Sequence, residues 1–230
     1  MHLTVRDAAK LLRRPEHQIY RWVEDGELPC LRVNDQPRFN RSELLEWATA
    51  RRLPVDPELF QDAEDGDRPL QALVAPLISG GIHYQVAGSD RASALRAVVG
   101  VMPLPPSLDR ETLVEVLLAR EAMGSTGVGD GIAIPHVRQP IAVPGATASV
   151  ALCFLDKPVD FKAVDGKPVH ALFMVVSPTI RAHLQILARL STALHDPGFK
   201  AAVVRRAPAE EIIAGARRLE LGAPASGRAP

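Results

Sequence analysis

Apolar residues recur every three or four positions in the first 52 residues, as they do on the buried faces of amphipathic helices. The spacing predicts a short extended entry at residues 3–5 and three helices, capped or begun by Thr4 or Asp7, by Pro15, and by Asn40 or Ser42. Gly26 ends the second helix, and two short apolar runs around residues 34–37 are typical of a β-hairpin. The order predicts a small winged helix-turn-helix domain over residues 1–52.

A different pattern begins at residue 53. Residues 53–68 open with prolines, and residues 53–67 contain six acidic side chains and no basic one, which favours a solvated linker. From residue 69 the pattern alternates between helical and strand types. Helices are predicted at residues 69–79, after Ser89 or Asp90, after Asp109, at 180–195 and at 208–219, and strands at 82–86, 149–155 and 169–176.

These alternating elements predict a second domain at residues 69–220, an α/β sandwich with a mixed sheet flanked by helices. Asp196-Pro197-Gly198 is expected to break the chain after the helix at 180–195, and the Gly/Ala/Pro-rich tail at 221–230 is expected to be disordered. The fold expected for the chain is therefore two domains joined by an acidic linker.

Composition excludes some classes of function. The net charge is zero, so no global charge attracts nucleic acid or membrane, although residues 1–52 carry ten basic and eight acidic side chains. Cys30 and Cys153 lack metal-ligand spacing, which favours free thiols in a reducing compartment. The charged N-terminus is no signal peptide, and the apolar runs are too short to span a bilayer. A cytoplasmic location is expected.

The densest chemistry lies in residues 120–136, where a helical run ends, four glycines follow at close spacing, and Pro135-His136 closes the stretch. Glycine permits positive φ and close approach of a ligand, and successive N–H groups in such turns can form an anion-holding nest. With Arg120 upstream, the residues indicate a phosphoryl site. A tight loop with a solvated histidine explains the same spacing, and the motif alone leaves both interpretations open.

The first domain resembles a known family. Leu3-Thr-Val-Arg-Asp-Ala-Ala-Lys-Leu-Leu12, Ile19-Tyr-Arg-Trp-Val23, Gly26-Glu-Leu-Pro29 and Leu44-Leu-Glu-Trp47 are similar to the excisionase-type helix-turn-helix proteins, which are related to the MerR winged helices. The resemblance implies that the second helix enters the DNA major groove, that the hairpin contacts the backbone, and that several copies act together. The DNA-binding residues it implies are Arg14, His17, Gln18, Arg21, Arg32 and Arg38. A helical adaptor that binds no nucleic acid is the alternative.

The second domain resembles the IIA domains of the bacterial phosphotransferase system, in the fructose–mannitol and nitrogen-regulatory branch. The matching segments are Arg120-Glu121, Gly124-Ser-Thr-Gly127, Gly131-Ile-Ala-Ile-Pro-His136, Pro158-Val-Asp-Phe161, Ser177-Pro178 and His183-Leu184. The resemblance implies that His136 accepts a phosphoryl group, that Arg120 clamps its oxygens, and that His183 is a second histidine of the site. Ser125, Thr126 and the N–H groups of the glycine turn would add donors.

Two departures from the family pattern bear on this site. Val137 follows His136 where the family has Gly or Ala, so its branched side chain is expected to crowd an approaching partner. Only residues 179–182 separate Ser177-Pro178 from His183, which is shorter than usual and could displace the second histidine. A zinc site of His136, His170 and His183 is the alternative use of the histidines, but the spacing does not support it, and no metal or cofactor is expected.

The two resemblances together predict a regulatory phosphocarrier. An HPr-type protein would phosphorylate His136, a IIB-type protein could accept the group, and the phosphorylation state would modulate binding of double-stranded DNA or assembly into a homo-oligomer. Two alternatives remain open. The chain could be a phosphocarrier whose first domain binds a protein instead of DNA, or an unphosphorylated scaffold whose IIA fold regulates partner proteins.

Overall fold

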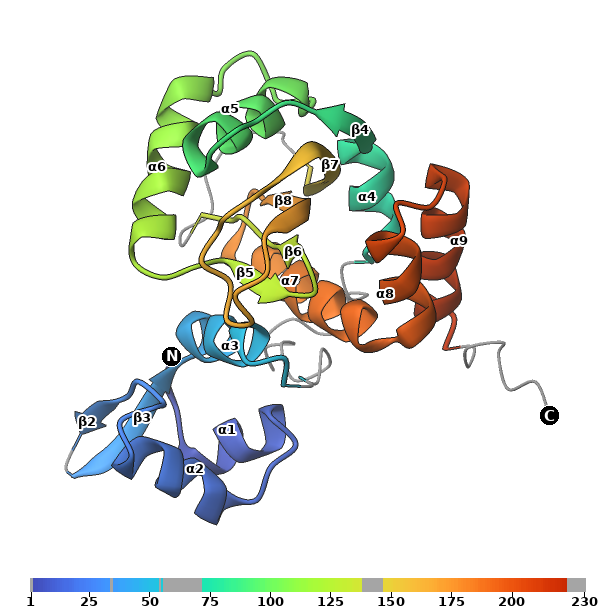
Figure 1. Cartoon of the computed structure of the whole chain (residues 1–230). Coiled ribbons are helices and arrows are strands. Elements are labelled where there is room, and N and C mark those ends of the chain that lie inside the picture. The colour runs from blue at the N-terminus through green and yellow to red at the C-terminus, as the bar shows by residue number, and fades with distance from the viewer. Residues whose placement is uncertain (1, 34, 54, 56–71, 138–146, 223–230) are drawn as a thin grey trace.

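A computed structural model of the chain describes residues 2–33, 35–53, 55, 72–137 and 147–222. Figure 1 shows two parts, a small N-terminal unit and a larger unit built on a sheet, which meet at helix α3. The predicted linker at 53–68 lies outside the described residues except for positions 53 and 55, as do the start of the helix expected at 69–79 and the tail from 223 onward. Two domains of the predicted classes are therefore confirmed.

Among its described residues, the N-terminal unit contains three helices and a three-stranded sheet. Its elements are β1 (His2–Leu3), α1 (Val5–Leu11), α2 (Glu16–Glu24), β2 (Leu31–Val33), β3 (Gln36–Asn40) and α3 (Arg41–Ala50). The strand order is β1-β3-β2, with both pairs antiparallel. Because β3 pairs on both edges, the predicted hairpin is anchored to the start of the chain.

Local capping explains where these helices begin. Thr4 and Asp7, the two predicted alternatives, form one reciprocal capping box at the start of α1. The side chain of Asn40 accepts hydrogen bonds from the N–H groups of Ser42 and Glu43 and so caps α3. The Asn40 cap fixes where α3 begins, and α3 is the helix that contacts the second unit.

The larger unit alternates helices and strands. Its elements are α4 (Val74–Gly80), β4 (Ile82–Val86), α5 (Arg91–Val101), α6 (Arg110–Ala122), β5 (Gly127–Gly129), β6 (Ile132–Ala133), β7 (Ser149–Val159), β8 (Val169–Val176), α7 (Ile180–His195), α8 (Pro197–Val204) and α9 (Ala209–Glu220). The sheet order is β4-β7-β8-β6-β5, with β4–β7 and β6–β8 parallel and β7–β8 and β5–β6 antiparallel. The sheet is mixed, as predicted.

Helices cover both faces of this sheet. Alternate side chains of β7 and β8 enter two hydrophobic clusters, and residues 149–155 of β7 and residues 171–176 of β8 are buried on both sides. Helices α5 and α6 pack on one face, and α4, α7, α8 and α9 supply apolar residues on the other. This double burial explains why both central strands appear in the sequence as continuous apolar runs.

Two features differ from the sequence prediction. Asp196-Pro197-Gly198 ends α7 but also begins α8, because the Asp196 side chain caps the new helix and Pro197 occupies its first turn. The glycine-spaced stretch forms the antiparallel β5–β6 hairpin at the sheet edge, where only a turn was expected. Both elements are too short for apolar periodicity to reveal them.

Helix α3 joins the two units. It packs against α7 and β5, and one hydrophobic cluster continues from the N-terminal unit through Leu45 and Ala48 to residues such as Ile134 and Leu187 of the larger unit. In Figure 1, α1, α2 and the β2–β3 hairpin lie on the opposite side of α3 from the sheet. Among the described residues, no helix is long and apolar enough to cross a membrane.

Candidate functional site

His136 lies at the junction of the two units, directly beyond β6. A parallel bridge pairs it with Val175, and the N–H of Val175 donates to the carbonyl oxygen of Pro135 at 3.1 Å. This extension of the β6–β8 pairing fixes the backbone under the imidazole. The residue is buried, with 5% of its surface exposed.

The hydrogen bond of one ring nitrogen determines the role of the other. His136 Nδ1 lies 2.7 Å from the carbonyl oxygen of Ile134. A carbonyl only accepts, so Nδ1 carries the hydrogen, and in the neutral ring Nε2 carries the lone pair. Nε2 has no hydrogen-bond partner among the described residues, although a carboxylate lies near it. Nε2 is therefore the ring nitrogen whose lone pair is available to act as a nucleophile.

Arg120 reaches the same small pocket from the last turn of α6. Its Nη1 donates to the carbonyl oxygen of Gly124 at 2.9 Å, and its Nη2 donates to Oε2 of Glu46 at the same distance. One pocket is lined by Arg120, Ser125, Thr126 and His136 together with Glu46 and Thr49 of α3. Four of the five predicted catalytic residues are thus brought together.

Ser125 and Thr126 line this pocket, but their polar groups differ in availability. The Thr126 hydroxyl and N–H both donate to the buried carboxylate of Glu121, at 2.6 and 3.1 Å. Ser125 Oγ accepts from the N–H of Gly127 at 2.9 Å, which leaves its hydroxyl hydrogen free to donate. Thr126 orders the turn through Glu121, whereas Ser125 retains a donor for a ligand.

The N–H groups of the glycine stretch also have partners inside the protein. Asp165 accepts from the N–H of Asp130 at 2.8 Å, and the N–H groups of residues 126 and 127 bond as described above. The glycines instead permit close packing in the hairpin: a Cβ on Gly127 would lie 2.6 Å from the Cβ of Ala163. The stretch is therefore a tightly packed hairpin that holds the loop before His136.

His183, the fifth predicted residue, lies in the first turn of α7 beside His136. The two ring centroids are 5.4 Å apart, and His183 Nδ1 is 3.1 Å from the hydroxyl oxygen of Ser177. The short segment between Ser177 and His183 therefore does not displace the histidine from the site. Burial, with a smaller contribution from His136, lowers the pKa of His183 to about 3, so it is a neutral hydrogen-bonding group at neutral pH.

The structure places Val137 away from the face where a partner was expected. Its side chain is 1% exposed and packs in the cluster beneath α5 and α6. The expected crowding of a partner by this branched side chain is thus not what the structure shows. Since alternate residues of an extended segment point to opposite sides, His136 faces the pocket while Val137 faces the core.

Glu46 was missed by sequence reasoning. It comes from the N-terminal unit, 90 positions before His136, and no motif surrounds it. Only its place in α3, between the buried residues Leu45 and Trp47, distinguishes it, and that place says nothing about a contact with the second unit. Its role emerges from the packing of α3 against the larger domain.

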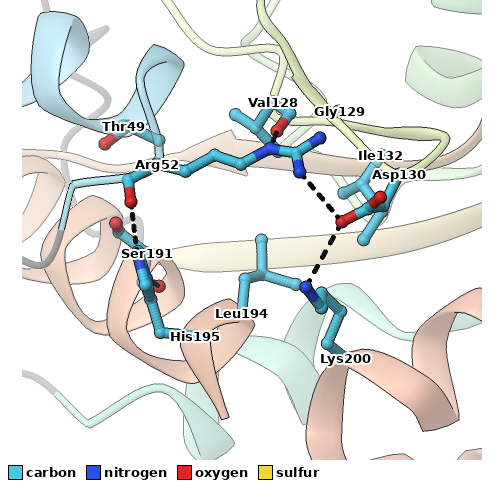
Figure 2. A pocket seen from close by; sticks show the side chains of 10 residues that line it. All are labelled: Thr49, Arg52, Val128, Gly129, Asp130, Ile132, Ser191, Leu194, His195 and Lys200. Atoms are coloured by element: carbon cyan, nitrogen blue, oxygen red, sulfur yellow. Dashed lines mark hydrogen bonds and ion pairs between the residues drawn. The ribbon is translucent and has the colours of Figure 1, made fainter. Parts of the chain in front are cut away.

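A second pocket lies at the same junction, shown in Figure 2. Arg52 crosses it: Nε donates to the carbonyl oxygen of Val128 at 2.6 Å, and Nη1 and Nη2 donate to Asp130 and Asp165 at 3.1 and 3.0 Å. His195 Nε2 donates to the carbonyl oxygen of Arg52 at 2.7 Å. Arg52 is thus a second polar attachment between the two units.

The candidate DNA-binding residues belong to α2, to the turn before it and to the β2–β3 hairpin. Arg14, His17, Arg21 and Arg32 are exposed, while Gln18 and Arg38 are half-buried. On α2, Arg21 Nε lies 3.6 Å from Asp25, an exposed pair of little energetic weight. The structure leaves this face accessible.

The remaining histidines do not form a metal site in the part of the chain that the structure describes. No group of three His, Cys, Asp or Glu side chains is arranged there to hold an ion. His170, the third member of the alternative zinc site, packs its ring against the backbone of Gly131. Burial raises the pKa of the Cys153 thiol to about 12, so this cysteine is an inert core residue.

Comparison with known proteins covers both units. Residues 81–215 match the family model described as phosphoenolpyruvate-dependent sugar phosphotransferase system, EIIA 2, and residues 3–52 match one described as a helix-turn-helix domain. A nitrogen regulatory protein of Pseudomonas aeruginosa is 36% identical over 141 residues, which are 60% of this chain and 88% of the relative. One from Bradyrhizobium diazoefficiens is 33% identical over 132 residues, or 56% and 81%. The solved nitrogen regulatory protein IIA-Ntr from Neisseria meningitidis aligns with a TM-score of 0.51 and 28% identity, over 61% of this chain and 94% of that one.

Proposed function

The chain belongs to the EIIA 2 family of the phosphoenolpyruvate-dependent sugar phosphotransferase system, and from that premise we propose that it is a regulatory phosphocarrier that accepts a phosphoryl group on His136. The observation that carries this proposal is the fixed Nε2 of His136, held by the Nδ1–Ile134 hydrogen bond in a pocket that also contains Arg120. The relatives named nitrogen regulatory protein favour a regulatory role over sugar transport.

The chemistry follows from the geometry. The lone pair of Nε2 attacks phosphorus in line, a new N–P bond forms, and the bond to the donor's leaving atom breaks with its electron pair returning to the donor. Nδ1 keeps its hydrogen throughout and donates it to the carbonyl oxygen of Ile134, so no base is needed. Arg120 and the Ser125 hydroxyl are the groups placed to hold the phosphoryl oxygens, and neutral His183 adds a hydrogen-bonding ring nearby.

Family membership also supplies the partners of this proposal. An HPr-type phosphohistidine protein donates the group, and a IIB-type protein could receive it. The helix-turn-helix domain favours double-stranded DNA as a further partner, with phosphorylation of His136 modulating that binding or the assembly of several copies. The position of α3 supports the coupling, since the same helix belongs to the N-terminal unit and lines the pocket of His136.

Transfer from labelled phosphoenolpyruvate through enzyme I and HPr tests the carrier function. The parent chain and a His2→Ala control, which alters an exposed residue of β1, are expected to become labelled, whereas His136→Ala is expected to retain none of the label. Acid lability and alkali stability of the label identify a phosphohistidine. A folded parent chain that takes up no label would leave the scaffold role as the better interpretation.

A further inference from the structure

Glu46 places a carboxylate from the helix-turn-helix domain inside the phosphorylation site. Its Oε2 lies 2.9 Å from Nη2 of Arg120, and its Oε1 lies 3.4 Å from Nε2 of His136. The three side chains are nearly enclosed, with 12%, 12% and 7% of their surfaces exposed. A carboxylate from one domain therefore contacts both of the principal groups of the other domain's site.

The carboxylate occupies space that a phosphoryl group needs. Phosphorus bonded to Nε2 would lie closer to that atom than Glu46 Oε1 does now, with three oxygens around it. The Nη2 donor of Arg120 that would hold one of these oxygens is already bonded to Glu46. Two anions cannot share this pocket, because like charges at contact distance in a buried site repel strongly.

The closed arrangement also shields the nucleophile from a protein donor. Thr49 and Ala50 of the same helix line the pocket beside Glu46, and His136 is almost entirely buried. An HPr-type protein must bring its own phosphohistidine within bonding distance of Nε2, so α3 has to move before transfer.

We propose that the helix-turn-helix domain is a gate over its own phosphorylation site, with the Glu46 carboxylate standing where the phosphoryl group binds. The proposal rests on the proposed phosphocarrier function of His136. Transfer requires Glu46 to leave, and the phosphorylated histidine excludes its return. Phosphorylation thereby converts a closed chain into an open one in which α3 is released from the second domain.

The junction combines the apolar contact of Leu45 and Ala48 with polar attachments, and the polar attachments fit a releasable contact. The second attachment, Arg52 with Asp130 and Asp165, is a partly exposed set of ion pairs, with 43% of the Arg52 side chain exposed. Such contacts are individually weak and exchange readily with water. The site's charge changes by about −2 on phosphorylation, which replaces an Arg120–Glu46 attraction with repulsion between Glu46 and the phosphoryl group.

The test compares the initial rate of labelling of the full chain by phosphorylated HPr in Glu46→Ala and Glu46→Gln with the parent. Glu24→Ala, which removes an exposed glutamate from α2, is the matched control. Both Glu46 variants are expected to be labelled roughly tenfold faster than the parent, since loss of one hydrogen bond between charged groups shifts a two-state equilibrium by about that factor. Damage to the fold of the second domain cannot produce a faster rate, so a gain identifies the gate.

Small-angle scattering gives a second readout, which for the Glu46 variants does not depend on phosphoryl transfer. The Glu46 variants and the phosphorylated parent are expected to be more expanded than the unphosphorylated parent and than Glu24→Ala. Equal labelling rates in the parent and both Glu46 variants, with unchanged scattering, would overturn the gate and leave the carrier function intact. Absence of label from every variant would overturn the carrier function and the gate with it.

Discussion

His136 and His183, the two histidines of the site, have different hydrogen-bond partners and therefore different roles. His136 uses a backbone carbonyl to fix its hydrogen on Nδ1 and present Nε2, whereas His183 uses the Ser177 hydroxyl and remains in the interior. Burial keeps His183 neutral, and it also makes protonation of this side chain unfavourable in the folded chain, because solvent cannot stabilise the charged imidazole there. This difference has a measurable consequence for stability.

The free energy of unfolding is predicted to decrease as the pH is lowered, because of His183. Its pKa is about 3 in the folded chain against an ordinary value of 6.5, so above pH 6.5 both states are neutral and the full stability is present. Between pH 6.5 and 3, His183 binds a proton in the unfolded chain but stays neutral in the folded chain. The free energy of unfolding is therefore lower by about 2 kcal/mol at pH 5. Urea unfolding at pH 7 and pH 5 measures this loss.

The matched variant is His183→Gln, which retains a polar side chain that does not titrate. Its stability is expected to fall by about 2 kcal/mol less than that of the parent between the two pH values. His136 and Glu46, the two charged or titratable groups that act on His183, are unchanged in this variant. Equal losses would show that His183 is not the group responsible.

At the level of elements, the β5–β6 hairpin connects the site to the N-terminal domain. Gly129 has φ +86°, and a Cβ built there would lie 1.4 Å from Nη2 of Arg52. The glycine thus serves both the turn and the close approach of an arginine from the other domain. A glycine noted in the sequence for ligand binding turns out to accommodate an interdomain contact.

Replacement of Gly129 with alanine is predicted to destabilise the chain by about 1–3 kcal/mol, from positive-φ strain and displacement of Arg52. Thermal unfolding measures the loss. The control is Gly100→Ala in α5, where an added Cβ would meet no described atom outside its own helix within 4 Å, and it should gain about 0.5–1 kcal/mol. In an Arg52→Ala background, the destabilisation caused by Gly129→Ala should fall to the part that comes from backbone strain. An undiminished penalty there would remove Arg52 from the explanation.

Much of both domains could be predicted from the sequence because their signals are local. Caps such as Thr4, Asn40, Asp90 and Asp109 mark helix starts, and the doubly buried strands β7 and β8 are continuous apolar runs. The two family resemblances, which rest on residues in matching order, are both confirmed by the family models. What the sequence could not reveal is non-local: α3 carries Glu46 into a pocket whose other walls lie 74 or more positions later.

At the scale of the whole molecule, the closed arrangement separates two faces of the N-terminal domain. Helix α3 is turned toward the second domain, while α2 and the β2–β3 hairpin lie on the side facing away from it (Figure 1). The proposed DNA-binding residues belong to these elements and to the turn before α2. If two copies bind DNA together, as the helix-turn-helix resemblance implies, release of α3 would change their arrangement without uncovering a hidden DNA surface.

This separation leads to a prediction about DNA. If the outer face binds the DNA backbone, Arg32→Ala is expected to weaken binding to all duplex sequences and to reduce the slope of log affinity against log salt by about 0.9. Glu46→Ala, which opens the gate, is expected to change affinity for a single site by less than about twofold, because the face is exposed in both states. Fluorescence anisotropy with a short duplex at several salt concentrations measures both quantities.

A tenfold change of single-site affinity in Glu46→Ala would mean that the second domain does restrain the DNA-binding face. Absence of DNA binding at low salt would favour a protein partner for the N-terminal domain.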